Sequence, residues 1–282
     1  MKRLISLLAL LILIEACKKN KLDEYTYNTH FEIQSVPDTE EEVFRNKFEK
    51  YVEVFGVRIF GHKKTEDAKI LHAANIMAQY LDNDEDGDVD NPLVLEKMLE
   101  SQAFLIMFPT QRKQRFSGVM NNLPDDQHGQ DLYGSETHPQ GRENLVFDAA
   151  LEEVWHLISS SGYSKAYPDA FGEEQGSLIA EAMDVARGGQ YQEIPSNYPE
   201  TAWYTYTDAT CEYNCQVTEY FYWGLTSLLG AQNYEGRGEE ISHEWEYNTP
   251  SQMENDVLLI DLLQDSTYLL PTILPDGHYN PQ

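Results

Sequence analysis

Five aspartates occupy alternate positions in the nine residues from Asp82 to Asp90, and this run constrains the fold around it. Carboxylates held so close together repel one another unless a cation neutralises them, so the run favours a tight loop around a bound ion. Apolar residues recur at helical spacing before it, over residues 66–81, and Pro92 occupies a favourable first position for a helix over residues 92–100. The run therefore predicts a helix, an ion-binding loop and a second helix in succession.

The chemistry of this loop is typical of calcium sites. Hard Ca²⁺ takes about six to eight oxygen ligands, and Gly87 at the sixth position permits the sharp turn that brings alternate side chains inward. The loop resembles the EF-hand type, but Leu93 stands at the position where that type has a bidentate glutamate. A solvated acidic turn without a cation is the alternative. The candidate calcium ligands are Asp82, Asp84, Asp86, Asp88 and Asp90.

A second group of polar residues lies on the helix expected over residues 144–161. Glu152 and His156 are four residues apart and therefore share one face of that helix, with Glu153 beside them. Two ligands one turn apart, and a neighbouring carboxylate to activate water, are what a helix-borne metal site requires. The alternative is a solvated or hydrogen-bonded polar face. Glu219, a carboxylate within an aromatic run, is a rival ligand, because buried carboxylates are uncommon unless they are paired.

Residues 144–187 resemble part of the gluzincin type of zinc metallopeptidase. That type has His-Glu-x-x-His on one helix, then a glutamate ligand and an aspartate on a second helix, and Gly-Ser-Leu-Ile-Ala-Glu-Ala-Met-Asp looks like that second helix. The resemblance implies that Glu152, His156 and Glu181 bind the metal. It further implies that Glu153 is the catalytic base and that Asp184 orients a ligand.

The motif departs from that family at its first ligand, where Glu152 stands in place of histidine. Two carboxylates and one imidazole make a harder, more anionic site, which lowers the Lewis acidity available to the metal. The implied cofactor is zinc or another divalent transition metal. An inactive relic of a metallopeptidase is the alternative.

The remaining pattern predicts an α+β fold, a mainly helical body with few short strands, and the resemblance implies a zincin-like helix pair within it. Residues 121–143 carry no clear pattern. Residues 39–120 are expected to form a helical subdomain with the calcium loop, and residues 121–282 a zincin-like helical subdomain. Helices are expected over residues 39–52, 66–81, 92–100, 144–161, 174–187, 216–229 and 252–263, and strands over residues 57–60 and 103–108.

The first residues are typical of an export signal. A basic start at Lys2 and Arg3 precedes an apolar run over residues 4–14, which is too short to span a bilayer. The segment that ends in Ala16-Cys17 resembles a bacterial lipoprotein signal. We therefore expect a signal peptide over residues 1–16, a lipid anchor on Cys17 and a polar tether over residues 17–38. An ordinary secretory signal is the alternative.

The cysteines agree with export. Besides Cys17, the chain has only Cys211 and Cys215, and two thiols so close in sequence predict a small-loop disulfide in an oxidising compartment. Free buried thiols are the alternative.

The charge balance excludes one class of partner. The chain has 48 acidic and 20 basic residues, a formal net charge of -28, and such an excess of carboxylate repels phosphate backbones. Nucleic acid is therefore not expected as a partner. We expect a lipid-anchored metalloprotein of the bacterial cell envelope, on the outer membrane or cell surface, acting as a metal-dependent peptidase or hydrolase. The alternative is a calcium-stabilised surface lipoprotein without enzymatic activity, which binds glycan or protein through its aromatic segments.

Overall fold

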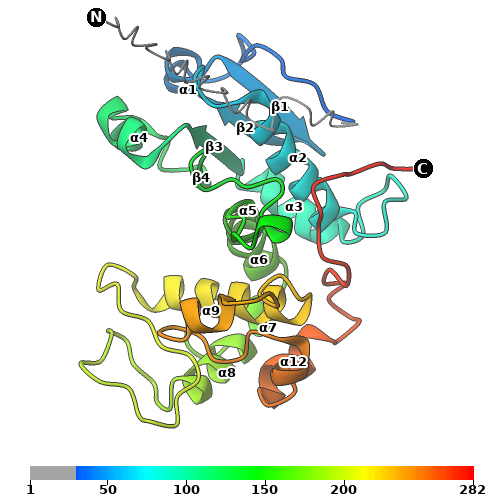
Figure 1. The fold of residues 1–282 in the computed structure, drawn as a ribbon. Helices are drawn as coiled ribbons and strands as arrows, with labels where there is room; N and C mark the ends of the chain where they lie inside the picture. The colour runs from blue at the N-terminus through cyan, green and yellow to red at the C-terminus, as the bar shows by residue number, and fades with distance from the viewer. Residues whose placement is uncertain (1–29) are drawn as a thin grey trace, which may run out of the picture.

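The computed structural model describes residues 30–282 (Figure 1). The expected signal peptide, the expected lipid anchor on Cys17 and most of the expected tether lie outside the described residues. The last part of that tether packs on the body, since Gln34 bridges to Tyr51 and the Phe31 ring stacks on Tyr279. Over residues 30–282, no helix combines the length and apolar character that crossing a membrane requires.

A mixed four-stranded sheet forms one end of the molecule, in the order β1-β2-β3-β4 (Figure 1). Its strands are β1 (Lys50–Val54), β2 (Val57–Gly61), β3 (Phe104–Phe108) and β4 (Gly129–Tyr133). β1 and β2 pair antiparallel through a two-residue turn, where Phe55 and Gly56 both have positive φ. β3 runs parallel to both of its neighbours. With the helical body that follows, the sheet confirms the α+β class.

β3 is a central strand of the sheet. It is buried on both faces, as is usual for a parallel strand. Its alternate side chains enter two different cores. Phe104, Ile106 and Phe108 join a small aromatic cluster with α1 (Glu42–Lys47). Leu105 and Met107 join the large core that extends into the helical body.

The expected helix over residues 39–52 is wrong in its second half. α1 ends at Lys47, and Tyr51 and Val52 belong to β1, where they pair with Phe60 and Ile59 of β2. Aromatic and β-branched side chains favour a strand. The spacing of these residues also fits a helix, but their pairing with β2 decides for the strand.

α2 (Asp67–Leu81) and α3 (Pro92–Glu100) lie close to their expected positions, whereas α4 (Gln111–Ser117) stands where no helix was expected. Asn91 caps α3 by accepting a hydrogen bond from the Val94 N–H, and Thr110 caps α4 in the same way through Lys113.

The second half is helical and irregular. Its first long element is continuous from α5 through a π-helical turn, Ser159–Tyr163, into α6. Short 3₁₀ turns, Met120–Asn122 and Arg142–Asn144, stand where no pattern was expected. The helices are α5 (Ala150–Ile158), α6 (Ser164–Ala166), α7 (Pro168–Phe171), α8 (Leu178–Ala186), α9 (Tyr213–Leu228), α10 (Arg237–Ile241), α11 (Pro250–Met253) and α12 (Val257–Leu263).

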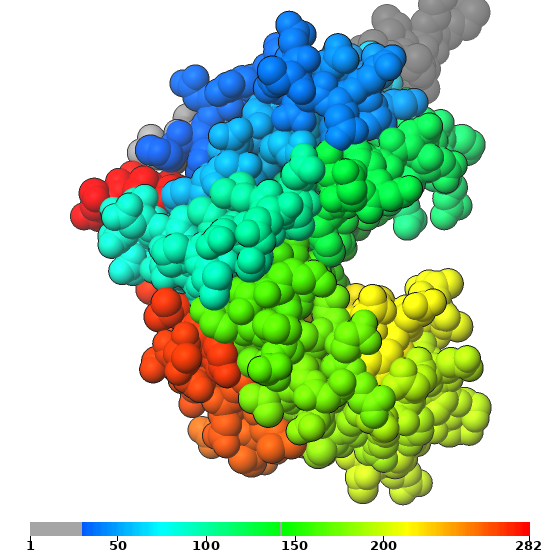
Figure 2. Space-filling model, turned by 180° about the vertical axis from the view of Figure 1, so that it is seen from behind, coloured from blue at the N-terminus to red at the C-terminus, as the bar shows by residue number. Residues whose placement is uncertain are grey.

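The two halves share one core rather than dividing near residue 120. β4 follows that point in the sequence and pairs with β3 of the first half. The C-terminal segment returns to α2 and the loop after it. Asn83 Oδ1 in that loop accepts hydrogen bonds from the Thr272 and Ile273 N–H groups, and the Asn75 amide on α2 donates to the Gly277 carbonyl. Figure 2 shows a deep notch on the other side, between a green segment around residues 110–140 and yellow segments around residues 190–220.

Candidate metal centre

α5 presents a polar face because its opposite face is committed to the core. Asp148 anchors the start of the helix by accepting hydrogen bonds from the His138 and Ala150 N–H groups while it pairs with His72 at 2.6 Å. The buried residues of α5 include Leu151, Val154, Trp155, Leu157 and Ile158. Glu152 and Glu153 are only partly buried and occupy the polar face.

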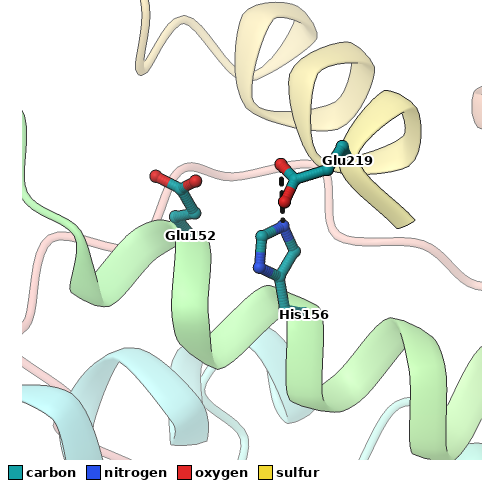
Figure 3. A group of neighbouring side chains, drawn as sticks. All are labelled: Glu152, His156 and Glu219. Atoms are coloured by element: carbon teal, nitrogen blue, oxygen red, sulfur yellow. Dashed lines mark ion pairs between the residues drawn. The ribbon is translucent and has the colours of Figure 1, made fainter. Parts of the chain in front are cut away.

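α9 packs against α5 and supplies a third side chain, Glu219. One ligand atom from each of Glu152, His156 and Glu219 lies within 4.8 Å of the others. Figure 3 shows the His156 ring rising from α5 toward Glu219, with Glu152 alongside. Two carboxylates and one imidazole on two packed helices can hold a metal ion.

The surroundings of His156 Nε2 favour a bound ligand at this position. The side chain is 8% exposed, and Nε2 lies 3.5 Å from Glu219 Oε2 without a hydrogen bond to any residue in the described range 30–282. Buried polar atoms nearly always make a hydrogen bond, and the long ion-pair contact with Glu219 leaves that requirement of Nε2 unmet. A divalent metal fits this nitrogen and the two carboxylates that face it.

The electrostatics of the group also favour a cation. Burial raises the pKa of Glu152 to about 8, and the neighbouring carboxylates Glu153 and Glu219 add to the shift. Burial alone lowers the pKa of His156, but Glu219 and Glu153 outweigh it and hold the pKa well above its ordinary value. The site therefore concentrates negative charge in a buried place, and either bound protons or a metal cation can offset that charge.

Glu153 is held beside this group from the sheet. Its Oε2 lies 3.4 Å from His156 Nδ1 and accepts a 2.5 Å hydrogen bond from the Gln130 amide on β4. Glu136 adds a further carboxyl near Glu153, and burial is the main cause that raises its pKa to about 7. The edge strand of the sheet thus contributes directly to the surroundings of Glu153.

The structure does not bring the other two residues predicted by the metallopeptidase resemblance to this site. Glu181 is exposed on α8, because Ala182 and Met183 beside it face the core. Asp184 pairs with Arg187 at 2.6 Å and accepts a hydrogen bond from the Tyr213 hydroxyl.

Glu219 stands in the place expected for Glu181. The sequence pointed to Glu219 as a rival ligand, because it is a lone carboxylate within the aromatic run of α9.

In the acidic loop, ligand atoms of Asp82, Asp84 and Asp86 also lie within 4.8 Å of one another. Asp82 is fully buried, and its Oδ2 accepts hydrogen bonds from the Gly87 N–H at 2.9 Å and from the Tyr279 hydroxyl at 2.5 Å. These three aspartates can hold a metal ion.

The two remaining predicted calcium ligands do not join that group. Asp88 is exposed, and Asp90 accepts a hydrogen bond from the Asn83 N–H at 2.7 Å. Burial, followed by repulsion from Asp84 and Asp82, raises the pKa of Asp90.

The predicted disulfide is confirmed. Cys211 and Cys215 are bonded, with their Cα atoms 5.3 Å apart. The bridge lies at the start of α9, which begins at Tyr213, and so it restrains the chain that leads into the helix carrying Glu219.

No protein-family model, no curated protein and no solved structure matches this chain. Its function has to be inferred from its own geometry.

Proposed function

We propose that Glu152, His156 and Glu219 bind a divalent transition metal such as zinc and that the protein is a metal-dependent hydrolase. The observation that carries the proposal is that one ligand atom each from Glu152, His156 and Glu219 lies within 4.8 Å of the others, while the buried His156 Nε2 makes no hydrogen bond to any described residue. A structural zinc site is usually closed by four protein ligands, whereas a catalytic site keeps an open position. Three ligands from two helices match the second pattern.

The chemistry follows from the residues around that position. A bound metal supplies Lewis acidity, which polarises a carbonyl and lowers the pKa of water. Glu153 accepts the proton of the attacking water and can return it to the leaving group. Gln130 orients Glu153 through its 2.5 Å hydrogen bond and leaves the other carboxylate oxygen available for the water.

A peptide is the substrate class that the surroundings favour. β4 is an edge strand of the sheet, and Gln130 on this strand contacts Glu153. An extended peptide can add to such an edge through main-chain hydrogen bonds, which would carry it past the proposed base. The notch in Figure 2 lies between the segment that contains β4 and the segments that lead into α9, and it offers room for such a chain.

The test of hydrolysis is the Glu153→Gln variant, assayed on a library of unstructured peptides after zinc loading. Loss of the base is expected to lower kcat by about 10²–10⁴-fold while zinc content stays unchanged. Glu181→Gln is the matched control, because it removes an exposed carboxylate elsewhere on the helical body. Peptide cleavage that persists in Glu153→Gln at the native rate would contradict the assignment.

For the acidic loop, we propose a structural calcium ion bound by Asp82, Asp84 and Asp86. Exported modules bind calcium with constants of about 10⁻⁴–10⁻³ M, which suffices where calcium is plentiful. The hydrogen bond from Tyr279 to Asp82 supports a clamping role, because it ties the C-terminal segment to the loop between α2 and α3. An ion there would hold three parts of the chain together.

We further propose that the protein is exported and anchored through a lipid on Cys17. The Cys211–Cys215 bridge supports export, since disulfides persist mainly in oxidising compartments. Metabolic labelling with radioactive palmitate in a bacterial host should mark the native protein and not a Cys17→Ser variant. Equal labelling of both would refute the anchor.

The alternative function, binding of glycan or protein by aromatic segments, receives less support. Tyr204, Tyr220 and Tyr222 are fully buried and contribute to the main core instead of a surface groove.

A further inference from the structure

A cavity of about 390 Å³ lies where five segments of the chain meet. The segments are α2, the chain that leads into α5, α5 itself, the chain after α9 and the C-terminal segment. None of the three proposed metal ligands lines it. Small-molecule sites have volumes of about 300–1,000 Å³, are mainly apolar with a few polar groups, and often lie where parts of a protein meet. The cavity has the size and the location of such a site.

The buried residues that line this cavity form its floor and make it mainly apolar. Ile76, Leu151 and Ala231 are apolar members of the floor, and they are 1%, 9% and 5% exposed. Asp148 also belongs to the floor, but its Oδ2 is already hydrogen-bonded to His72 Nε2 at 2.6 Å. A ligand charge on this floor would lose its water without gaining a partner, which is costly. The floor therefore favours an apolar group.

Two exposed carboxylates, Glu143 and Asp276, also line the cavity and form its rim. Asp276 Oδ1 accepts a hydrogen bond from the Gln79 amide at 2.9 Å, which holds the carboxylate without neutralising it. Among the side chains that the structure describes, neither rim carboxylate has an ion-pair partner. No described lysine or arginine side chain lines the cavity. The rim therefore carries two uncompensated negative charges.

Two basic side chains in this part of the molecule do not offset the charge of the rim. Burial lowers the pKa of His138, which also lines the cavity, so its imidazole is uncharged at neutral pH. Arg237 packs on the ring of Phe147, 4.2 Å from its centre, and its Nη1 pairs with Glu240 at 3.1 Å. The charge of Arg237 is thus already matched by a different carboxylate.

We propose that this cavity binds a small organic cation, whose apolar body lies on the floor and whose ammonium group lies at Glu143 and Asp276. Charge complementarity favours a cation over an anion, because the rim carboxylates and the net charge of -28 both repel negative ligands. A bare inorganic cation does not fit, since a strongly hydrated ion gains nothing from an apolar floor. The site is separate from the proposed metal centre and does not depend on it.

The test uses three probes that share one apolar body and differ in charge, namely phenylpropylamine, phenylpropanol and phenylpropanoate. Their affinities for the native protein are measured by isothermal titration calorimetry at low salt, without added transition metal, at about pH 8, where an ordinary histidine is uncharged. The amine is expected to bind about tenfold more tightly than the alcohol, because two exposed ion pairs each add a modest contribution. The propanoate is expected to bind more weakly than the alcohol.

A Glu143→Gln/Asp276→Asn variant removes the charge of the rim and keeps the oxygen that accepts from Gln79. In this variant the amine and the alcohol should bind equally, while the affinity for the alcohol stays at its native value. Asp125→Asn/Asp126→Asn is the matched control, because it removes two exposed carboxylates that do not line the cavity. The control should keep the native preference for the amine.

An Ala231→Leu variant tests the floor. The larger side chain occupies apolar space that the ligand body would fill, so the amine and the alcohol should each lose more than about tenfold in affinity. Thermal unfolding of the variant shows whether it still folds.

The outcomes decide on the cavity without reference to the metal centre. Absence of amine binding by the native protein, or equal affinity for the amine and the propanoate, overturns the proposal. A preference for the amine that survives in Glu143→Gln/Asp276→Asn, or that is lost equally in the control, overturns it as well. Native affinity in a folded Ala231→Leu protein places the amine elsewhere and has the same consequence. If Ala231→Leu does not fold, the rim variant and its control decide alone.

Discussion

Replacing Glu136 by glutamine is expected to stabilise the protein at pH 8 and to leave its stability nearly unchanged at pH 4. Burial, and then the carboxylates of Glu153 and Asp131, raise the pKa of Glu136 from 4.5 to about 7. The folded protein therefore holds this proton more tightly than the unfolded chain does. The associated stability is fully present below about pH 4.5 and is lost as the pH rises through about 7.

The size of the effect follows from the shift. Each pKa unit corresponds to about 1.4 kcal/mol, so the whole shift corresponds to about 3 kcal/mol of unfolding free energy. Because Glu136 is only half-buried, solvent screening reduces the expected gain at pH 8 to about 1–2 kcal/mol. Glutamine retains the acceptor for the Tyr133 N–H, which donates to Glu136 Oε1 at 3.0 Å, so the substitution removes the charge without removing this contact.

The assay is urea unfolding at pH 4 and pH 8 in the presence of chelator, which prevents a metal near Glu153 from changing the titration. Glu143→Gln is the control, because Glu143 lies in the next segment of the chain and is exposed. It should have no pH-dependent effect. A Glu136→Gln gain that is the same at both pH values, or that appears only at pH 4, would refute the reasoning.

Three further outcomes are expected. Chelator should lower the unfolding free energy of the native protein by about 2 kcal/mol when calcium was present at about 20-fold above its Kd. It should have no such effect in an Asp84→Asn/Asp86→Asn variant, and calorimetry in which both proteins respond equally would exclude calcium from the loop. Phe44→Ala should cost about 3–5 kcal/mol in chemical denaturation because Phe44 is fully buried against Phe60, whereas Phe116→Ala, at an exposed position, should cost less than about 0.5 kcal/mol. A Cys211→Ser/Cys215→Ser variant should lose about 2 kcal/mol, the cost expected for a short closed loop, and an unchanged Tm would show that the bridge contributes nothing.

The sequence predicted those helices and strands that have a clear local pattern, either an apolar helix face or a continuous apolar run. α2 is confirmed within a residue of its expected start, and β3 is a continuous apolar run that reads correctly as a buried strand. β4 could not be predicted in this way. Of its five residues only Leu132 is buried, so the strand carries no alternation, and its existence depends on pairing with β3.

The candidate site likewise has a part that depends on local sequence and a part that depends on tertiary packing. Glu152 and His156 are one helical turn apart, so their proximity is a local property that the sequence displays. The third ligand depends on which later helix packs against α5. That choice is tertiary, and α9 with Glu219 takes the position that the spacing alone had suggested for Glu181 on α8.

Zinc titration of the native protein, of Glu219→Gln and of Glu181→Gln tests the metal centre most directly. The native protein and Glu181→Gln should each bind one zinc ion at this site with the same affinity, because Glu181 is exposed and outside the ligand group. Glu219→Gln should lose more than about 100-fold in affinity, since removal of a direct ligand exceeds the loss of an outer partner. Zinc binding that is unchanged in Glu219→Gln, or that is lost in Glu181→Gln, would contradict the assignment.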